Sequence, residues 1–152
     1  MRLKIVETLI TDAPELSAGA AARILMSDIA YAQNRAVATQ TRHYVQFNGQ
    51  FVTVLSRPAG SSTLGVIIHP ITKDNYVTTY GDGGTSGLTA TSIGTANFGT
   101  SATLGFDDLG SPFAYTTGSE TPLTSPGTVT ILSGNQTLIV SVEPYTGETT
   151  VR

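Results

Sequence analysis

"LSAGAAARILMSDIAYAQNRAVATQ", residues 16–40, decides the fold, because its apolar side chains recur at helical spacing with no proline to interrupt them. At 100° per residue they gather in one stripe. The stripe contains Ala22, Leu25, Met26, Ile29, Gln33, Ala36 and Val37. We therefore predict an amphipathic helix that ends near residue 40. Ser17 is the predicted N-cap, since its hydroxyl can accept a bond from a first-turn amide.

The opposite face of this helix is less polar than a solvated face. It carries Ile24, Asp28, Tyr31 and Arg35 at helical spacing. We expect this face to bind a partner, because Tyr and Arg are common anchors of protein interfaces. The alternative is that Ile24 and Tyr31 are single exposed apolar residues, which are normal on soluble proteins.

The pattern becomes β after residue 42. In "RHYVQFNGQFVTVL" (42–55), Asn48-Gly49 is a two-residue hairpin signal of type I′, which places Phe47 opposite Gln50. The apolar alternation agrees with this turn. It puts on one face Val45, Phe47, Val52 and Val54.

Further strands follow the hairpin. We expect them at residues 64–69, 75–80, 102–106, 128–132, 137–142 and 149–152, with a turn at Ser133-Gly134-Asn135. The Gly/Ser/Thr-rich segment 81–101 is either a loop, an irregular edge strand, or both. One helix followed by antiparallel strands predicts a single α+β domain over residues 1–152: a helical segment to residue 41 packs its apolar stripe on the sheet of a β-rich head, 42–152.

Composition removes several function classes. The 152 residues contain no cysteine, which excludes disulfides, Cys-ligated metals and thiol nucleophiles. The formal net charge is −3 and no run of Lys or Arg occurs, so we expect no nucleic-acid partner. No stretch approaches the ~20 apolar residues of a membrane helix.

Catalytic motifs are scarce. His43 and His69 lie far apart in strand patterns, so structural histidines are favoured over a Ser-His-Asp triad. Asp107-Asp108 could ligate a hard cation, together with Asp82 or Glu143. The surrounding "GFDDLGSP" (105–112) is, however, typical of a tight turn. We expect no catalytic residue, no cofactor and no metal, although the sequence does not decide against a catalytic carboxylate pair.

Residues 21–47, "AARILMSDIAYAQNRAVATQTRHYVQF", resemble the region that follows the membrane segment in type IV pilin-like proteins. The similarity is to the H-type minor pseudopilins of type II secretion and to related minor type IV pilins. It is carried by Arg23, Leu25, Asp28, Ile29, Ala32-Gln33, Arg35-Ala36-Val37 and Val45-Gln46-Phe47.

Two later segments are similar to the same family. One is a Phe-x-x-x-Gly-x-Pro turn through Phe106, Gly110 and Pro112. The other is the closing strand, Thr-Gly turn and terminal strand, through Val142, Pro144, Thr146, Gly147 and Val151. Residues 57–101 match no part of the family's pattern.

The resemblance implies a structural function: a minor subunit of a pseudopilus or pilus that acts by assembling with other pilin-like subunits. It implies an inner-membrane anchor and a head in the periplasm or on the cell surface. "ETLITDAPEL" (7–16) only mimics the family's membrane segment, because Asp12 and Pro14 interrupt the apolar run. We therefore expect the anchoring helix to be absent from this chain, leaving a soluble monomer.

Two alternatives belong to other function classes. The first is a secreted or surface β-rich adhesion or carbohydrate-binding module, for which the region of Tyr76, Tyr80 and Phe98 would supply stacking rings. The second is a hydrolase that uses Asp107 or Asp108.

Overall fold

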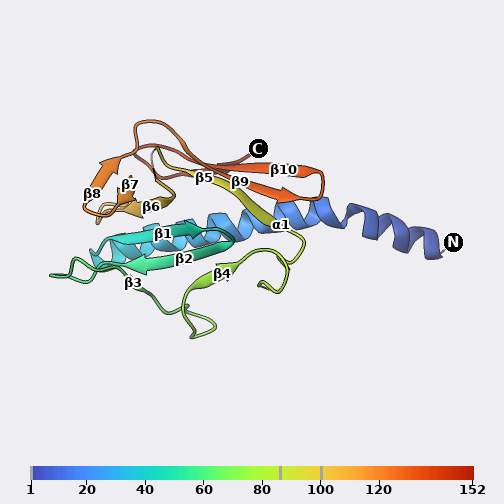
Figure 1. The fold of residues 1–152 in the computed structure, drawn as a ribbon, viewed down its shortest axis with the longest axis horizontal. Helices are drawn as coiled ribbons and strands as arrows, with labels where there is room; N and C mark the ends of the chain where they lie inside the picture. The colour runs from blue at the N-terminus through green and yellow to red at the C-terminus, as the bar shows by residue number, and fades with distance from the viewer. Residues whose placement is uncertain (1, 86, 100) are drawn as a thin grey trace.

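The computed structural model describes residues 2–85, 87–99 and 101–152, with side chains described from Ser17 onward. Within these residues the chain forms one helix, α1 (Arg2–Thr39), followed by eleven strands (Figure 1). The strands are β1 (His43–Asn48), β2 (Phe51–Ser56), β3 (Gly65–Val66), β4 (Val77–Thr79), β5 (Ser92–Asn97), β6 (Thr103–Phe106), β7 (Pro112–Thr116), β8 (Ser119–Pro122), β9 (Gly127–Ser133), β10 (Gln136–Val142) and β11 (Thr149–Val151).

The strands form two antiparallel sheets that share the helix. The larger has the order β3-β2-β1-β6-β7-β8, with β4 also paired to β2, and the smaller has the order β11-β10-β9-β5. Helix α1 contacts β9 and β10 of the smaller sheet and β1 of the larger (Figure 1). The predicted α+β class is therefore wrong, because one helix and eleven strands make the described chain mostly β. Two strands that sequence analysis did not assign, β7 and β8, account for part of the difference.

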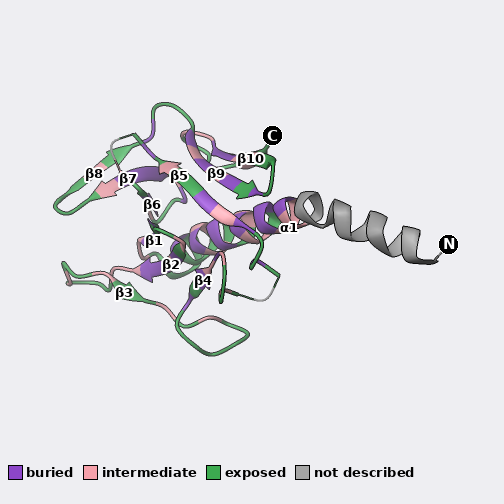
Figure 2. Cartoon of the chain, turned by 45° about the vertical axis from the view of Figure 1, so that its right-hand side comes forward, coloured by how far each residue is buried: buried purple, intermediate pink, exposed green. Residues whose placement is uncertain are grey.

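The predicted helical stripe is largely confirmed. Ala22, Leu25, Ile29 and Ala36 are buried, and Figure 2 shows buried segments along α1 where the strands cover it. Met26 and Gln33 are only half-buried. Val37 is 44% exposed, so its assignment to the core is wrong.

The predicted end of the helix is correct, but its predicted start is not. The expected end near residue 40 is confirmed, since Gln40 has a φ of 53° and follows Thr39, the last helical residue. Ser17 lies inside α1 and is not an N-cap.

The first hairpin has the predicted apolar face but another register. Asn48 pairs with Phe51, so the two-residue loop is Gly49-Gln50 and not Asn48-Gly49. Only Gly49 has a positive φ, 59°, whereas a type I′ turn needs two such residues. Gln50 explains the shift, because its Nε2 donates to the Ile93 carbonyl (3.0 Å) and its Oε1 accepts from the Ile93 amide (2.7 Å). This pair of bonds ties the turn to β5 of the other sheet.

The later strands follow the sequence patterns closely where alternation is strong. Strands β6, β9, β10 and β11 are confirmed, and the Ser133-Gly134-Asn135 turn joins β9 to β10. Of the expected strands at 64–69 and 75–80, only the short β3 and β4 form, both on the same edge of β2. The 81–101 segment contains both a loop and the irregular edge strand β5, whose register shifts between Ile93 and Ala96.

Candidate functional site on the face of helix α1

Asp28 is the most deeply buried charged residue of the predicted partner face. It is 5% exposed, and it accepts hydrogen bonds from the Tyr76 hydroxyl (2.8 Å) and the Thr78 hydroxyl (2.9 Å). Burial raises the pKa of Asp28, and the two hydroxyl donors oppose that shift. Thr78 lies in β4, the edge strand beside β2, and Tyr76 immediately precedes that strand, so Asp28 fastens this edge to α1.

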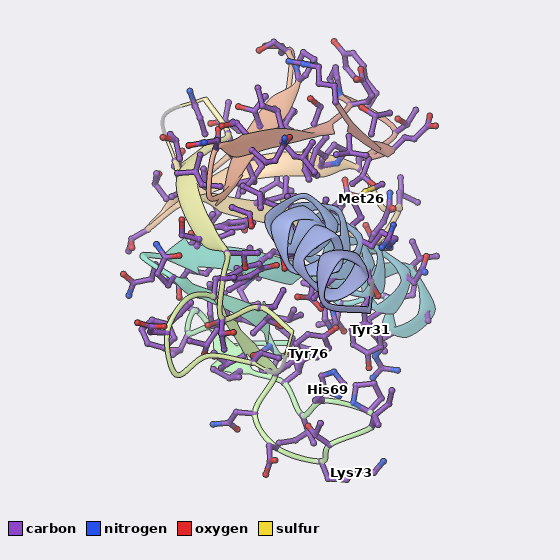
Figure 3. The ribbon with its side chains drawn as sticks, turned by 90° about the vertical axis from the view of Figure 1, so that its right-hand side faces the viewer. Met26, Tyr31, His69, Lys73 and Tyr76 are labelled. Carbon is purple, nitrogen blue, oxygen red and sulfur yellow. The ribbon has the colours of Figure 1, made fainter. Side chains whose placement is uncertain are left out.

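An aromatic stack covers the same face of the helix. The ring centroids of Tyr31 and Tyr76 are 5.2 Å apart, and those of His69 and Tyr76 are 4.4 Å apart. Figure 3 shows these three rings gathered between α1 and the loop that carries Lys73. Tyr76 therefore lies between Tyr31 of the helix and His69, whereas residues 70–75 are exposed.

The structure thus places the four predicted partner residues differently from one another. Asp28 is buried, Ile24 and Tyr31 are half-buried against the core, and Arg35 is exposed. The chain itself covers Asp28 and Tyr31, because Tyr76 and Thr78 bond to Asp28 and the Tyr76 ring stacks on Tyr31. Strands were predicted at 64–69 and 75–80, but no pattern there indicated a contact with α1, and the one available signal was a lone carboxylate between Leu25 and Ile29. Binding of a partner here stays a prediction.

A different stripe of α1 is open to solvent. Its members are exposed and mostly small: Arg23, Ser27, Ala30 and Asn34, with Arg35 beside them. Helices can approach closely along such side chains, so within residues 17–39 this stripe is available to a second protein.

Gln33 brings together the three motifs that carry the family resemblance. Its Nε2 donates to the Gly110 carbonyl (2.9 Å) and to the Thr146 carbonyl (2.8 Å). Gly147 has a φ of 70°, and a Cβ there would lie 2.7 Å from Gln33 Nε2 and 2.8 Å from Phe106 Cε1. Glycine is therefore required at position 147 for both conformation and space.

The two turns held by Gln33 belong to different sheets. Gly110 lies between β6 and β7 of the larger sheet, and Thr146 lies between β10 and β11 of the smaller. One helical amide thus ties both sheets to α1. Sequence analysis placed Gln33 in the apolar stripe and missed this function.

The residues considered for catalysis, His43, His69 and Asp107, are hydrogen-bonded to backbone groups of nearby turns. The His43 ring is buried with Nδ1 2.8 Å from the Thr41 carbonyl, and burial lowers its pKa. His69 Nδ1 accepts from the amides of Ile71 and Thr72. Asp107 Oδ1 accepts from the amides of Leu109 and Ser111, which confirms the tight turn.

The described residues contain no cluster of three or more His, Asp or Glu side chains placed to hold a metal ion. The rings proposed for sugar stacking, Tyr76, Tyr80 and Phe98, are at most 4% exposed. They are not available to stack on a carbohydrate.

Comparison with solved structures identifies one similar fold. The minor pseudopilin EpsH from the type 2 secretion system of Vibrio cholerae aligns with 89% of this chain and 94% of its own, with a TM-score of 0.59 and 12% sequence identity. The chain therefore has a pilin-like fold. No family model matches the sequence, and no curated protein matches it. Within the described part of the chain, α1 has no stretch that is apolar enough to cross a membrane.

Proposed function

We propose that this protein is a minor subunit of a pilin-like filament, either a type II secretion pseudopilus or a type IV pilus. The convergence of three separate sequence motifs on Gln33 carries the proposal, because it shows why those motifs occur together in one fold. The similarity of that fold to EpsH supports it. In this proposal the protein acts through contacts with other pilin-like subunits and not through catalysis. Its head faces the periplasm or the cell surface, and an N-terminal helix anchors it.

The exposed stripe of α1 is the proposed subunit contact. Ala30 lies at its centre between Ser27 and Asn34, where a neighbouring helix would meet small side chains. Arg23 and Arg35 supply charge at the ends of the stripe. The buried side of α1 is occupied by the chain's own sheets, so this stripe is where assembly would take place.

A complementation experiment tests this proposal in cells of the source organism. The gene is deleted and restored as wild type, as Ala30→Glu, or as the matched control Ala102→Glu, which places the same charge at an exposed alanine before β6. We expect Ala30→Glu to lose protein secretion or surface filaments at normal protein level, and the control to keep them. Normal secretion, piliation and DNA uptake in the deletion strain would contradict the proposal.

A further inference from the structure

Two arginines face each other across the β1–β2 pair, on the side of the larger sheet that points away from α1. Arg42 immediately precedes β1 and Arg57 immediately follows β2, and the Arg57 amide donates to the Arg42 carbonyl (3.0 Å). The next residues inward, Tyr44 and Leu55, pair on the same outer face. Like charges directly opposite each other destabilise a sheet. The pair therefore needs a stabilising partner.

Glu120 on β8 is that partner, and it serves both arginines. Its carboxylate pairs with Arg42, lies 2.7 Å from Arg57 Nη2, and accepts from the Tyr44 hydroxyl at 3.0 Å. The guanidinium groups rest on aromatic rings, Arg42 at 5.4 Å from the Phe113 centroid and Arg57 at 6.0 Å from that of Tyr44. Two cations share one anion, so one positive charge is left over in a chain whose net charge is −3.

A cavity opens beside this surplus charge. Its volume is about 450 Å³, and it is lined by Arg42, Arg57, Ser62, Tyr115, Ser119 and Glu120. A guanidinium carries five N–H donors, and within the described residues Glu120 engages one nitrogen of each arginine. Unused donors therefore line a cavity that also offers the hydroxyls of Ser62, Thr117 and Ser119 and the aromatic wall of Tyr115.

We propose that this cavity binds a carboxylate, namely an acidic side chain of a protein partner. The planar fork of arginine matches the two oxygens of a carboxylate, and the Glu120 carboxylate occupies one nitrogen of each fork. One surplus positive charge balances a singly charged group, whereas a dianion would meet uncompensated repulsion from Glu120. Tyr115 forms an apolar wall for the methylene stem of the incoming side chain. The site lies on the opposite side of the sheet from α1, and it does not depend on the proposed function.

NMR titration of the ¹⁵N-labelled full chain tests the proposal. The probes are the peptide acetyl-Glu-Glu-Glu-amide, its all-glutamine counterpart, and sodium sulfate at matched ionic strength. We expect the glutamate peptide alone to cause saturable shifts at Ser62, Gly118 and Ser119, which line the cavity. Equal shifts from the glutamine peptide, or saturation by sulfate without saturation by the glutamate peptide, would overturn the carboxylate assignment.

Two variants should change the affinity for the glutamate peptide in opposite directions, and a third serves as a control. Arg57→Gln should weaken binding at least about tenfold, because it removes a charge-assisted pair. Glu120→Gln should strengthen binding several-fold, because it removes the internal competitor. Lys73→Gln, at an exposed cation of the loop between β3 and β4, is the control and should change nothing. If Arg57→Gln does not fold, as judged from its own spectrum, Arg42→Gln replaces it. Unchanged affinity in the folded arginine variant and in Glu120→Gln would place the peptide elsewhere and overturn the proposal.

Discussion

Asp28 illustrates how one side chain can hold a segment whose contact with the helix has no signal in the sequence. A buried carboxylate is costly unless it is hydrogen-bonded. The hydroxyls of Tyr76 and Thr78 satisfy both of its oxygens from a strand edge about fifty positions later in the chain. The cost of burial is therefore offset by contacts that fasten the 65–80 segment to α1.

The raised pKa of Asp28 predicts a pH dependence of stability. The folded chain retains a proton at Asp28 that the unfolded chain releases near the ordinary pKa of 3.8. The contribution of Asp28 is therefore complete below pH 3.8 and is lost as the pH rises through the raised folded pKa. In urea unfolding, Asp28→Asn, which stays neutral, should gain stability relative to wild type as the pH rises. A constant difference between about pH 4 and pH 7 would show that burial does not perturb this carboxyl.

The two hydrogen bonds of Gln33 predict a loss of stability when its side chain is removed. Gln33→Ala leaves the Gly110 and Thr146 carbonyls without their donor, which should cost ~1–3 kcal/mol of unfolding free energy. Gln46→Ala, at an exposed glutamine of β1, is the control and should stay within about 0.5 kcal/mol of wild type. Equal midpoints for the two variants in chemical unfolding would remove Gln33 as the link between the sheets.

At the scale of elements, the buried and exposed parts of the helical stripe should differ in energy. Ile29 is fully buried, and Ile29→Ala should cost ~2–5 kcal/mol because it opens a cavity in the core. Val37 is 44% exposed, and Val37→Ala should change stability by no more than about 0.5 kcal/mol. Thermal and urea unfolding of the two variants measure this contrast. Similar losses would mean that Val37 is covered in solution.

The same elements show how far sequence reasoning reaches. The helix and strands such as β9 and β10 could be predicted because their periodicity is local. The register of the first hairpin could not, since it depends on a bond between Gln50 and Ile93, 43 positions apart. Strands β7 and β8 pair over residues 112–122, where proline, glycine and hydroxyl residues hide the alternation.

The candidate site could be predicted only in part, because long-range contacts decide which face of α1 stays open. The end of α1 was predicted correctly, but which of its faces stays open depends in part on Tyr76 and Thr78. The segment 65–80 reaches the helix through these two residues, and spacing in the sequence does not show such a contact. The open stripe therefore lies at Ser27, Ala30 and Asn34 and not at Asp28.

At the scale of the whole molecule, α1 is the element that both sheets share. The larger sheet contacts it through β1 and the smaller through β9 and β10, and Gln33 bonds to a turn from each. Over residues 17–39 the helix leaves a stripe of mostly small side chains exposed, which suits it to pack beside a second helix. This architecture is the physical basis for proposing a filament subunit.

Site-specific crosslinking tests that central claim most directly. The chain has no cysteine, so Ala30→Cys in the full-length protein introduces a unique thiol on the open stripe, and Ala102→Cys is its matched control. Cells that express each variant are treated with a short bismaleimide while the other pilin-like subunits carry single cysteines on their own helices. We predict a covalent adduct between Ala30→Cys and a pilin-like subunit, identified by mass spectrometry, and none with the control. Adducts that are absent, or equally abundant from both positions, would contradict assembly through helix α1.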